Sequence, residues 1–150
     1  MKDKYSLEDV KSSFSFSVPV QIRFSDIDGY MHVNNGIYFS FFEHARASFL
    51  YEVCGWDVMD IGTVVANINI AYKQPIHAFD EPLVYVRIKS VGNTSFVMEQ
   101  VIMGMAKNQG ERIFAHAETV MVAVSMKDMK PVPIPQKFRA KMESSASNAF

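Results

Sequence analysis

One short polar segment holds most of the residues that could do chemistry in this chain. Residues 26–35 contain two aspartates, a histidine and two asparagines. A carboxylate can attack an ester-type carbonyl or activate a water molecule, and a histidine can move or stabilise a proton. Aspartate, asparagine and glycine also favour bonds between their side chains and the nearby backbone, so the segment is predicted to be a loop. It is the candidate site for hydrolytic or acid/base chemistry.

Each polar residue of this loop has a catalytic and a structural interpretation. Asp28 is the candidate catalytic carboxylate; the alternative is a loop aspartate that bonds its own backbone, as Asp-Gly pairs often do. His32 is a hydrogen-bond partner that tunes the charge of Asp28, or a structural loop histidine. Asn34 and Asn35 are primarily helix caps, with contact to a substrate as a second possibility. Asp26 is assigned to structure.

The loop leads into a long apolar segment, from Gly36 to about Cys54, that is predicted to be one helix. Asn34 or Asn35 would cap it and Gly55 would end it. Apolar residues spread around most of its first half, which predicts a helix surrounded by other elements. The free N–H groups at a helix start carry partial positive charge, so an acyl oxygen near Asn35, Gly36 and Ile37 would be polarised without a metal.

The rest of the chain is predicted to form the sheet that surrounds this helix. Alternating apolar and polar residues, separated by turns, predict five strands: residues 18–24, 64–73, 83–91, 95–106 and 112–125. The last three read as an antiparallel meander. We therefore expect an α+β fold, a curled antiparallel sheet of about five strands wrapped around one long central helix. The proline-rich segment and the Ser/Ala-rich end predict a flexible tail from about residue 140.

Composition limits the size, location and partners of the protein. A chain of 150 residues with 49% hydrophobic residues and a net charge of -1 fits a single domain over residues 1–150. The charge argues against nucleic acid as a partner, and no apolar stretch is long enough to cross a membrane. A single cysteine, Cys54, and an N-terminus without a secretory pattern indicate the cytoplasm. The apolar surplus fits a chain that buries surface against another subunit.

Other candidate sites in the sequence are weaker. Asp26, Asp28 and His32 could form a metal cluster, but the calcium-loop pattern fails and zinc would need further ligands, so neither a metal nor another cofactor is expected. Glu43 and Arg46 are three residues apart on the predicted helix and could pair with each other. Glu43 is also a candidate second carboxylate. Cys54 has no adjacent histidine, so a nucleophilic thiol is not expected.

The loop and the start of the helix resemble a known family. Residues 23–35, together with Phe42-Glu43-His44-Ala45-Arg46 on the helix, are similar to the hot-dog-fold acyl-CoA thioesterases, and most of all to the hydroxybenzoyl-CoA thioesterase branch. The likeness extends from Val18 to about Arg139. It implies a hot-dog fold, and it places the catalytic role on Asp28 and the thioester carbonyl near the helix start. Met31 stands where the family often has glycine.

These observations lead to one expected function and two alternatives. We expect an acyl-CoA thioesterase that hydrolyses an acyl thioester to free acid and thiol, with Asp28 as nucleophile or general base. The substrate would be carried on coenzyme A or on an acyl-carrier protein, and the protein would be a homodimer or homotetramer. The alternatives are a hot-dog dehydratase or hydratase, with His32 and Glu43 or Asp28 as its acid/base pair, and a non-catalytic acyl-thioester binding protein.

Overall fold

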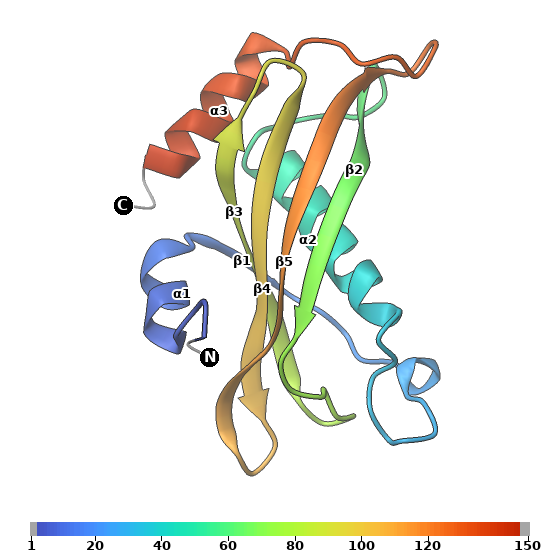
Figure 1. Cartoon of the computed structure of the whole chain (residues 1–150), viewed down its shortest axis with the longest axis vertical. Coiled ribbons are helices and arrows are strands. Elements are labelled where there is room, and N and C mark those ends of the chain that lie inside the picture. The colour runs from blue at the N-terminus through green and yellow to red at the C-terminus, as the bar shows by residue number, and fades with distance from the viewer. Residues whose placement is uncertain (1–2, 148–150) are drawn as a thin grey trace.

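The protein is described here by a computed structural model that covers residues 3–147. Along the chain lie α1 (Leu7–Ser13), β1 (Phe16–Pro19), a 3-10 turn η1 (Phe24–Asp26), α2 (Ile37–Glu52), β2 (Ile61–Tyr72), β3 (Glu81–Val91), β4 (Ser95–Ala106), β5 (Gly110–Ser125) and α3 (Gln136–Ser147). Figure 1 shows the long strands standing side by side, with α2 running along one face of the sheet.

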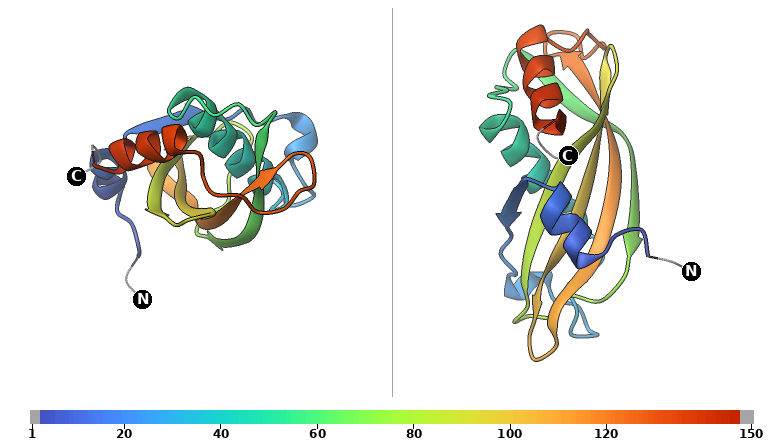
Figure 2. Two further views of the ribbon diagram at one scale, coloured as in Figure 1. Left: turned by 90° about the horizontal axis from the view of Figure 1, so that it is seen from above. Right: turned by 90° about the vertical axis from the view of Figure 1, so that its left-hand side faces the viewer.

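The sheet is antiparallel and has the strand order β1-β3-β4-β5-β2. The hairpins β3–β4 and β4–β5 confirm the predicted meander, and β2 returns to pair with β5. Figure 2 shows the sheet curling so that its concave face wraps α2. The predicted α+β hot-dog fold is therefore confirmed.

Helix α2 packs against the concave face because most of its first half is apolar. Its inward residues are buried, among them Tyr38, Phe41, Phe42, Ala45, Phe49 and Leu50. Gly55 follows the helix with a φ of 64°, a left-handed conformation that glycine adopts without steric cost. The predicted helix is confirmed, and its start is held at one end of the sheet.

Two predicted details near the N-terminus are wrong. The first strand was expected over residues 18–24, but β1 covers Phe16–Pro19, and only a single backbone bond, from Val20 N to Pro82 O at 3.3 Å, continues its pairing with β3. Val20 and Ile22 still pack against the core, so their alternation reflects burial without strand pairing. Helix α1 was not expected; it packs on the outer face of the sheet through Val10.

The C-terminal segment is a packed helix where a tail was predicted from about residue 140. Phe138 stacks on Trp56 with ring centroids 4.5 Å apart and an interplanar angle of 12°, and Met142 is fully buried. These two residues are four apart, so they lie on one side of α3. The tail prediction is wrong as far as Ser147, because two apolar anchors outweigh a polar composition; residues 148–150 lie outside the described part.

Replacing Phe138 with alanine should destabilise the fold. We expect Phe138→Ala to lower the free energy of unfolding by about 3–5 kcal/mol, the usual range for deleting a buried phenylalanine. Lys141→Ala, at an exposed position of the same helix, should change it by no more than about 0.5 kcal/mol. Urea unfolding followed by circular dichroism measures both. Equal stability of Phe138→Ala and the native protein would show that α3 is dispensable.

Candidate active site

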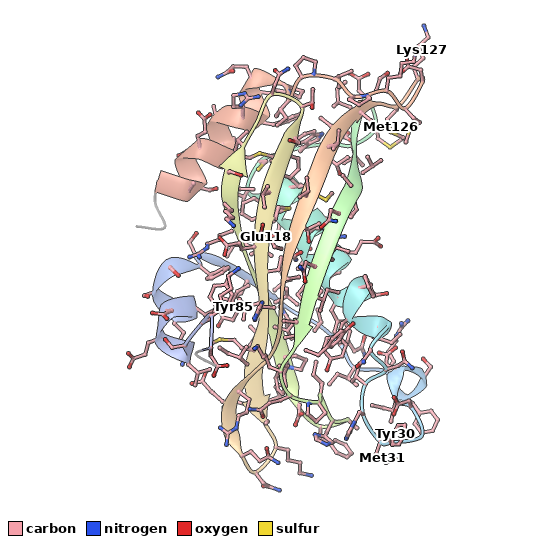
Figure 3. All side chains as sticks on the ribbon, viewed as in Figure 1. Tyr30, Met31, Tyr85, Glu118, Met126 and Lys127 are labelled. Carbon is pink, nitrogen blue, oxygen red and sulfur yellow. The ribbon has the colours of Figure 1, made fainter. Side chains whose placement is uncertain are left out.

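A tight backbone turn shapes the polar loop. Asp28 N–H donates to His32 O at 2.9 Å, and Met31 N–H donates to Asp28 O at 3.0 Å. Met31 has a φ of 63°, the left-handed region that favours glycine over residues with a side chain. The loop projects from the end of the molecule where α2 begins, and Figure 3 labels Tyr30 and Met31 at its tip.

Asp26 anchors this turn and takes no part in the open site. Its carboxylate is 1% exposed and accepts a bond from Arg23 N–H at 2.8 Å. Its backbone carbonyl accepts from Asn34 N–H at 2.8 Å, which closes the loop onto itself. The assignment of Asp26 to structure is confirmed.

Asp28 combines a structural bond with a free oxygen. Its Oδ1 accepts from Tyr30 N–H at 2.9 Å, the local backbone bond that the structural interpretation predicts. Oδ2 has no hydrogen bond within residues 3–147. The side chain lines a hollow of about 290 Å³ shared with Tyr30, His32, Val33, Asn34, Asn35, Tyr38 and Pro75. One oxygen therefore fixes the carboxylate and the other is available to a ligand.

His32 is held beside Asp28 by a second histidine. The backbone of His32 bridges to His77, and the two rings meet edge to face with centroids 4.9 Å apart. Asp80, which is 8% exposed, accepts from His77 N–H at 2.8 Å and lies 3.6 Å from His77 Nδ1. The position of His32 thus depends on a turn from the β2–β3 connection.

The start of α2 offers one free backbone donor. Asn34 Oδ1 accepts from Gly36 N–H at 2.8 Å, and Asn34 O accepts from Ile37 N–H at 2.9 Å. The N–H of Asn35, by contrast, has no hydrogen-bond partner in the described part of the chain. The predicted cap by Asn34 or Asn35 is wrong, because the N-cap position is Gly36 and no side chain caps it. The side chain of Asn34 instead uses the Gly36 N–H in a turn just before the helix, so that donor is not free. The backbone N–H of Asn35 is therefore the one that can donate to an acyl oxygen.

Two tyrosines form the wall next to this donor. Tyr72 Oη donates to Asn35 O at 2.9 Å, and the rings of Tyr72 and Tyr38 lie 4.9 Å apart. Burial raises the pKa of Tyr38 to about 12, so its phenol is neutral at physiological pH. The end of β2 is thereby tied to the start of α2, which fixes the Asn35 peptide.

The remaining candidates lie elsewhere. Glu43 and Arg46 form no ion pair among the described residues, since Glu43 is exposed and Arg46 is buried against the sheet. Burial also raises the pKa of the Cys54 thiol to about 11, which argues against a thiolate nucleophile. No group of three or more potential metal ligands occurs within residues 3–147, nor does a helix that could span a membrane.

Comparison with known proteins identifies the family. The model of the thioesterase-like superfamily matches residues 22–142. This chain belongs to that superfamily. The thioesterase match includes the loop, α2 and the whole meander, and it begins after α1 and β1. The resemblance seen in residues 23–35 is therefore confirmed.

Individual relatives of this thioesterase-superfamily chain agree with the assignment. The chain is 29% identical over 127 residues to the long-chain acyl-CoA thioesterase FadM of Escherichia coli, covering 83% of this chain and 94% of FadM. It is 32% identical over 126 residues to the uncharacterised Bacillus subtilis protein YsmA, covering 81% of each. A Thermus thermophilus thioesterase solved with coenzyme A and Zn is 28% identical, with a TM-score of 0.75 over 90% of this chain and 97% of that one.

Two features of this thioesterase-superfamily site escaped prediction. The spacing of His77 and Asp80 is that of a local turn, and nothing in the sequence shows that the turn reaches His32. The free N–H of Asn35 depends on how Asn34 bonds its neighbours, a choice that only the folded backbone reveals.

Proposed function

We propose that this protein hydrolyses an acyl-CoA thioester at the hollow beside Asp28. The supporting observation is that Asp28, whose carboxylate has one unused oxygen, and Asn35, whose backbone N–H is unpaired in the described chain, both line the same hollow. Thioester hydrolysis needs both a group that attacks or activates water and a donor for the oxyanion. The family's relatives include named thioesterases, which supports this chemistry.

The reaction has two balanced routes at this site. As a general base, Asp28 takes a proton from water, the hydroxide attacks the carbonyl carbon, and the C–S bond breaks to release a thiolate that takes up the proton. As a nucleophile, the carboxylate forms a mixed anhydride and releases the thiolate, after which water cleaves the anhydride. In both routes Asn35 N–H donates to the carbonyl oxygen as it becomes negative. His32 stabilises the charge of Asp28.

Coenzyme A is the proposed carrier of the acyl group. FadM is named for acyl-CoA hydrolysis, and the Thermus thermophilus neighbour was solved with coenzyme A. An acyl-carrier protein remains the alternative carrier. A cytoplasmic location is part of the proposal, because the free thiol of Cys54 suits a reducing compartment.

Product analysis tests the reaction class. Native protein incubated with benzoyl-CoA and with decanoyl-CoA should yield free acid and coenzyme A thiol in equal amounts from at least one of them. Conversion of 3-hydroxydecanoyl-CoA to the enoyl thioester, without thiol release, would instead indicate the dehydratase alternative. Binding of the thioesters without any conversion would indicate a binding protein.

A homodimer is the proposed minimal assembly, with a homotetramer as the larger alternative. Strand β2 forms one edge of the sheet, and its outer edge pairs with no other strand in the described chain. Beside that edge the side chains of Phe39 and Val65 are 48% and 43% exposed. A second copy that paired through β2 would cover both features. Sedimentation at micromolar concentration should show a dimer or tetramer, and a monomer there would contradict the proposal.

The hydroxyl of Tyr72 should support catalysis by holding the Asn35 peptide in place. Removing one such hydrogen bond costs about 0.5–1.5 kcal/mol, so Tyr72→Phe should lower kcat/KM for thioester hydrolysis roughly threefold to tenfold. The control is Tyr85→Phe on β3, which removes a hydroxyl far from the hollow. Initial-rate measurements that show equal losses in both variants would contradict a role for this contact.

A further inference from the structure

A second concavity, which we call the α2–β2 groove, lies between α2 and β2. It encloses about 720 Å³ and is lined mainly by apolar side chains, among them Ala47, Trp56, Val64, Val65, Met121 and Val124. Its polar residues include Arg46 and Glu43. A largely apolar concavity with a few polar groups has the size and character of a small-molecule site.

Arg46 is an unusual residue for such a groove. Its side chain is 5% exposed, and its one hydrogen bond runs from Nη1 to Gln100 Oε1 at 3.3 Å. No carboxylate within residues 3–147 lies within ion-pair distance of it. Burial lowers the pKa of Arg46, and the charge of Glu43, which lines the same groove beyond ion-pair distance, opposes that shift. No Arg46 nitrogen is both buried and unpartnered among the described residues, so the donors that Gln100 leaves unused open onto the groove, where an acceptor can reach them.

A buried polar atom without a hydrogen-bond partner lies on the sheet face that covers α2. Gln100 pairs with Ala117, and Thr119 lies two residues farther along β5, so both side chains point to the face that covers α2. Thr119 Oγ1 is buried without a hydrogen-bond partner among the described residues. Gln100 itself is satisfied, since its Nε2 donates to Phe42 O at 2.9 Å. Arg46 on α2 and Thr119 on β5 thus both form fewer hydrogen bonds than their polar groups allow.

Three side chains of β2, which we call the β2 strip, lie between the residues of the groove and the hollow at Asp28. Ile68, Ile70 and Tyr72 of β2 pair with Thr119, Ala117 and Ala115, so they face α2 as well. Tyr72 is the residue that contacts Asn35 at the hollow. From Ile37 to Arg46 the helix axis advances about 14 Å at 1.5 Å per residue. An extended chain covers about 3.3–3.6 Å per three bonds, so roughly twelve bonds span this distance.

We propose that Arg46 selects acyl groups that carry an oxygen acceptor, a hydroxyl or a carboxylate, at the end remote from the thioester. The inference rests on the proposed hydrolysis at Asp28. With the carbonyl carbon at the start of α2, an extended acyl chain lies along the β2 strip and its terminal oxygen accepts from the Arg46 guanidinium. The acceptor thereby joins Gln100 as a hydrogen-bond partner of Arg46.

Three coenzyme A thioesters of about twelve carbons, equal in length, test this selection: dodecanoyl, 12-hydroxydodecanoyl and the half-thioester of dodecanedioic acid. Native protein should show a KM at least about tenfold lower for one of the oxygenated chains than for the plain chain, as expected for a bond to a charged group. Preference for the hydroxyl or for the carboxylate identifies the acceptor. Arg46→Met should abolish the preference, while Arg87→Met on β3 should retain it.

Folding and binding measurements separate a failure of the proposed selection from a failure of the proposed hydrolysis. Circular dichroism without urea should show that Arg46→Met is folded, although its unfolding midpoint should fall because the buried Gln100 Oε1 loses its donor. Native protein that hydrolyses the plain chain as well as the oxygenated ones overturns the selection and leaves the hydrolase intact. If no thiol is released, calorimetry with the same thioesters applies: tighter binding of an oxygenated chain supports the selection, and equal binding overturns it.

Discussion

Asp28→Asn should lower kcat for thioester hydrolysis by roughly 10²–10⁴-fold, the range that a positioned acid or base contributes. The substitution keeps the shape of the side chain and an oxygen that can accept from Tyr30 N–H, so the turn at residues 28–32 should survive. What it removes is the negative charge at the unused oxygen. The loss should therefore appear in kcat more than in KM.

Asp128→Asn is the matched control for this substitution. Asp128 Oδ1 accepts from Lys130 N–H at 3.1 Å, the same bond to the residue two positions ahead, in a loop that follows β5. Its kcat should equal that of native protein. If both variants keep full activity, Asp28 is a structural loop residue; if Asp28→Asn unfolds while Asp128→Asn does not, Asp28→Glu would provide the test of charge.

Phe42→Ala should strongly destabilise the fold. Phe42 is fully buried between the helix and the sheet, and deleting a buried phenylalanine costs about 3–5 kcal/mol. That is a large share of the roughly 5–15 kcal/mol by which domains are stable. Because α2 also holds the start of the site, activity should fall at temperatures where the variant begins to unfold. Thermal and urea unfolding measure the effect.

Phe79→Ala removes the same side chain from an exposed position. Phe79 is 75% exposed in the β2–β3 connection, and its ring contacts the Lys107 ammonium, so its loss should change the free energy of unfolding by no more than about 1 kcal/mol. A Phe42→Ala variant as stable as Phe79→Ala would mean that α2 is not packed as described.

The fold could be predicted because its signals are local and repeat along the chain. Alternation over residues 95–106 and 83–91 predicted β4 and β3 almost to the residue, and the apolar helix predicted the element that the sheet surrounds. Helix α3 could not be predicted in this way. Its stability depends on Phe138 meeting Trp56, a contact between residues far apart in sequence, and not on the composition of the segment.

The sequence pointed to residues of the candidate site, but it did not predict how they are arranged. Loop chemistry and family resemblance pointed to Asp28, and the structure shows its carboxylate with one unused oxygen. Which amide is free was not predictable, because Asn34 and Asn35 are equally good caps in sequence and only the backbone determines that Asn34 bonds Gly36. An ion pair between Arg46 and Glu43 was one possibility in the sequence, but Arg46 is buried and bonded to Gln100.

The most direct test of the central claim is thiol release from aromatic and straight-chain acyl-CoA substrates, measured for native protein and Asp28→Asn under the same conditions. Hydrolysis of at least one substrate by native protein, with a loss of roughly 10²-fold or more in the variant, is the result that a carboxylate-driven thioesterase predicts. Thiol release at the same rate by both proteins, or by neither, would contradict it.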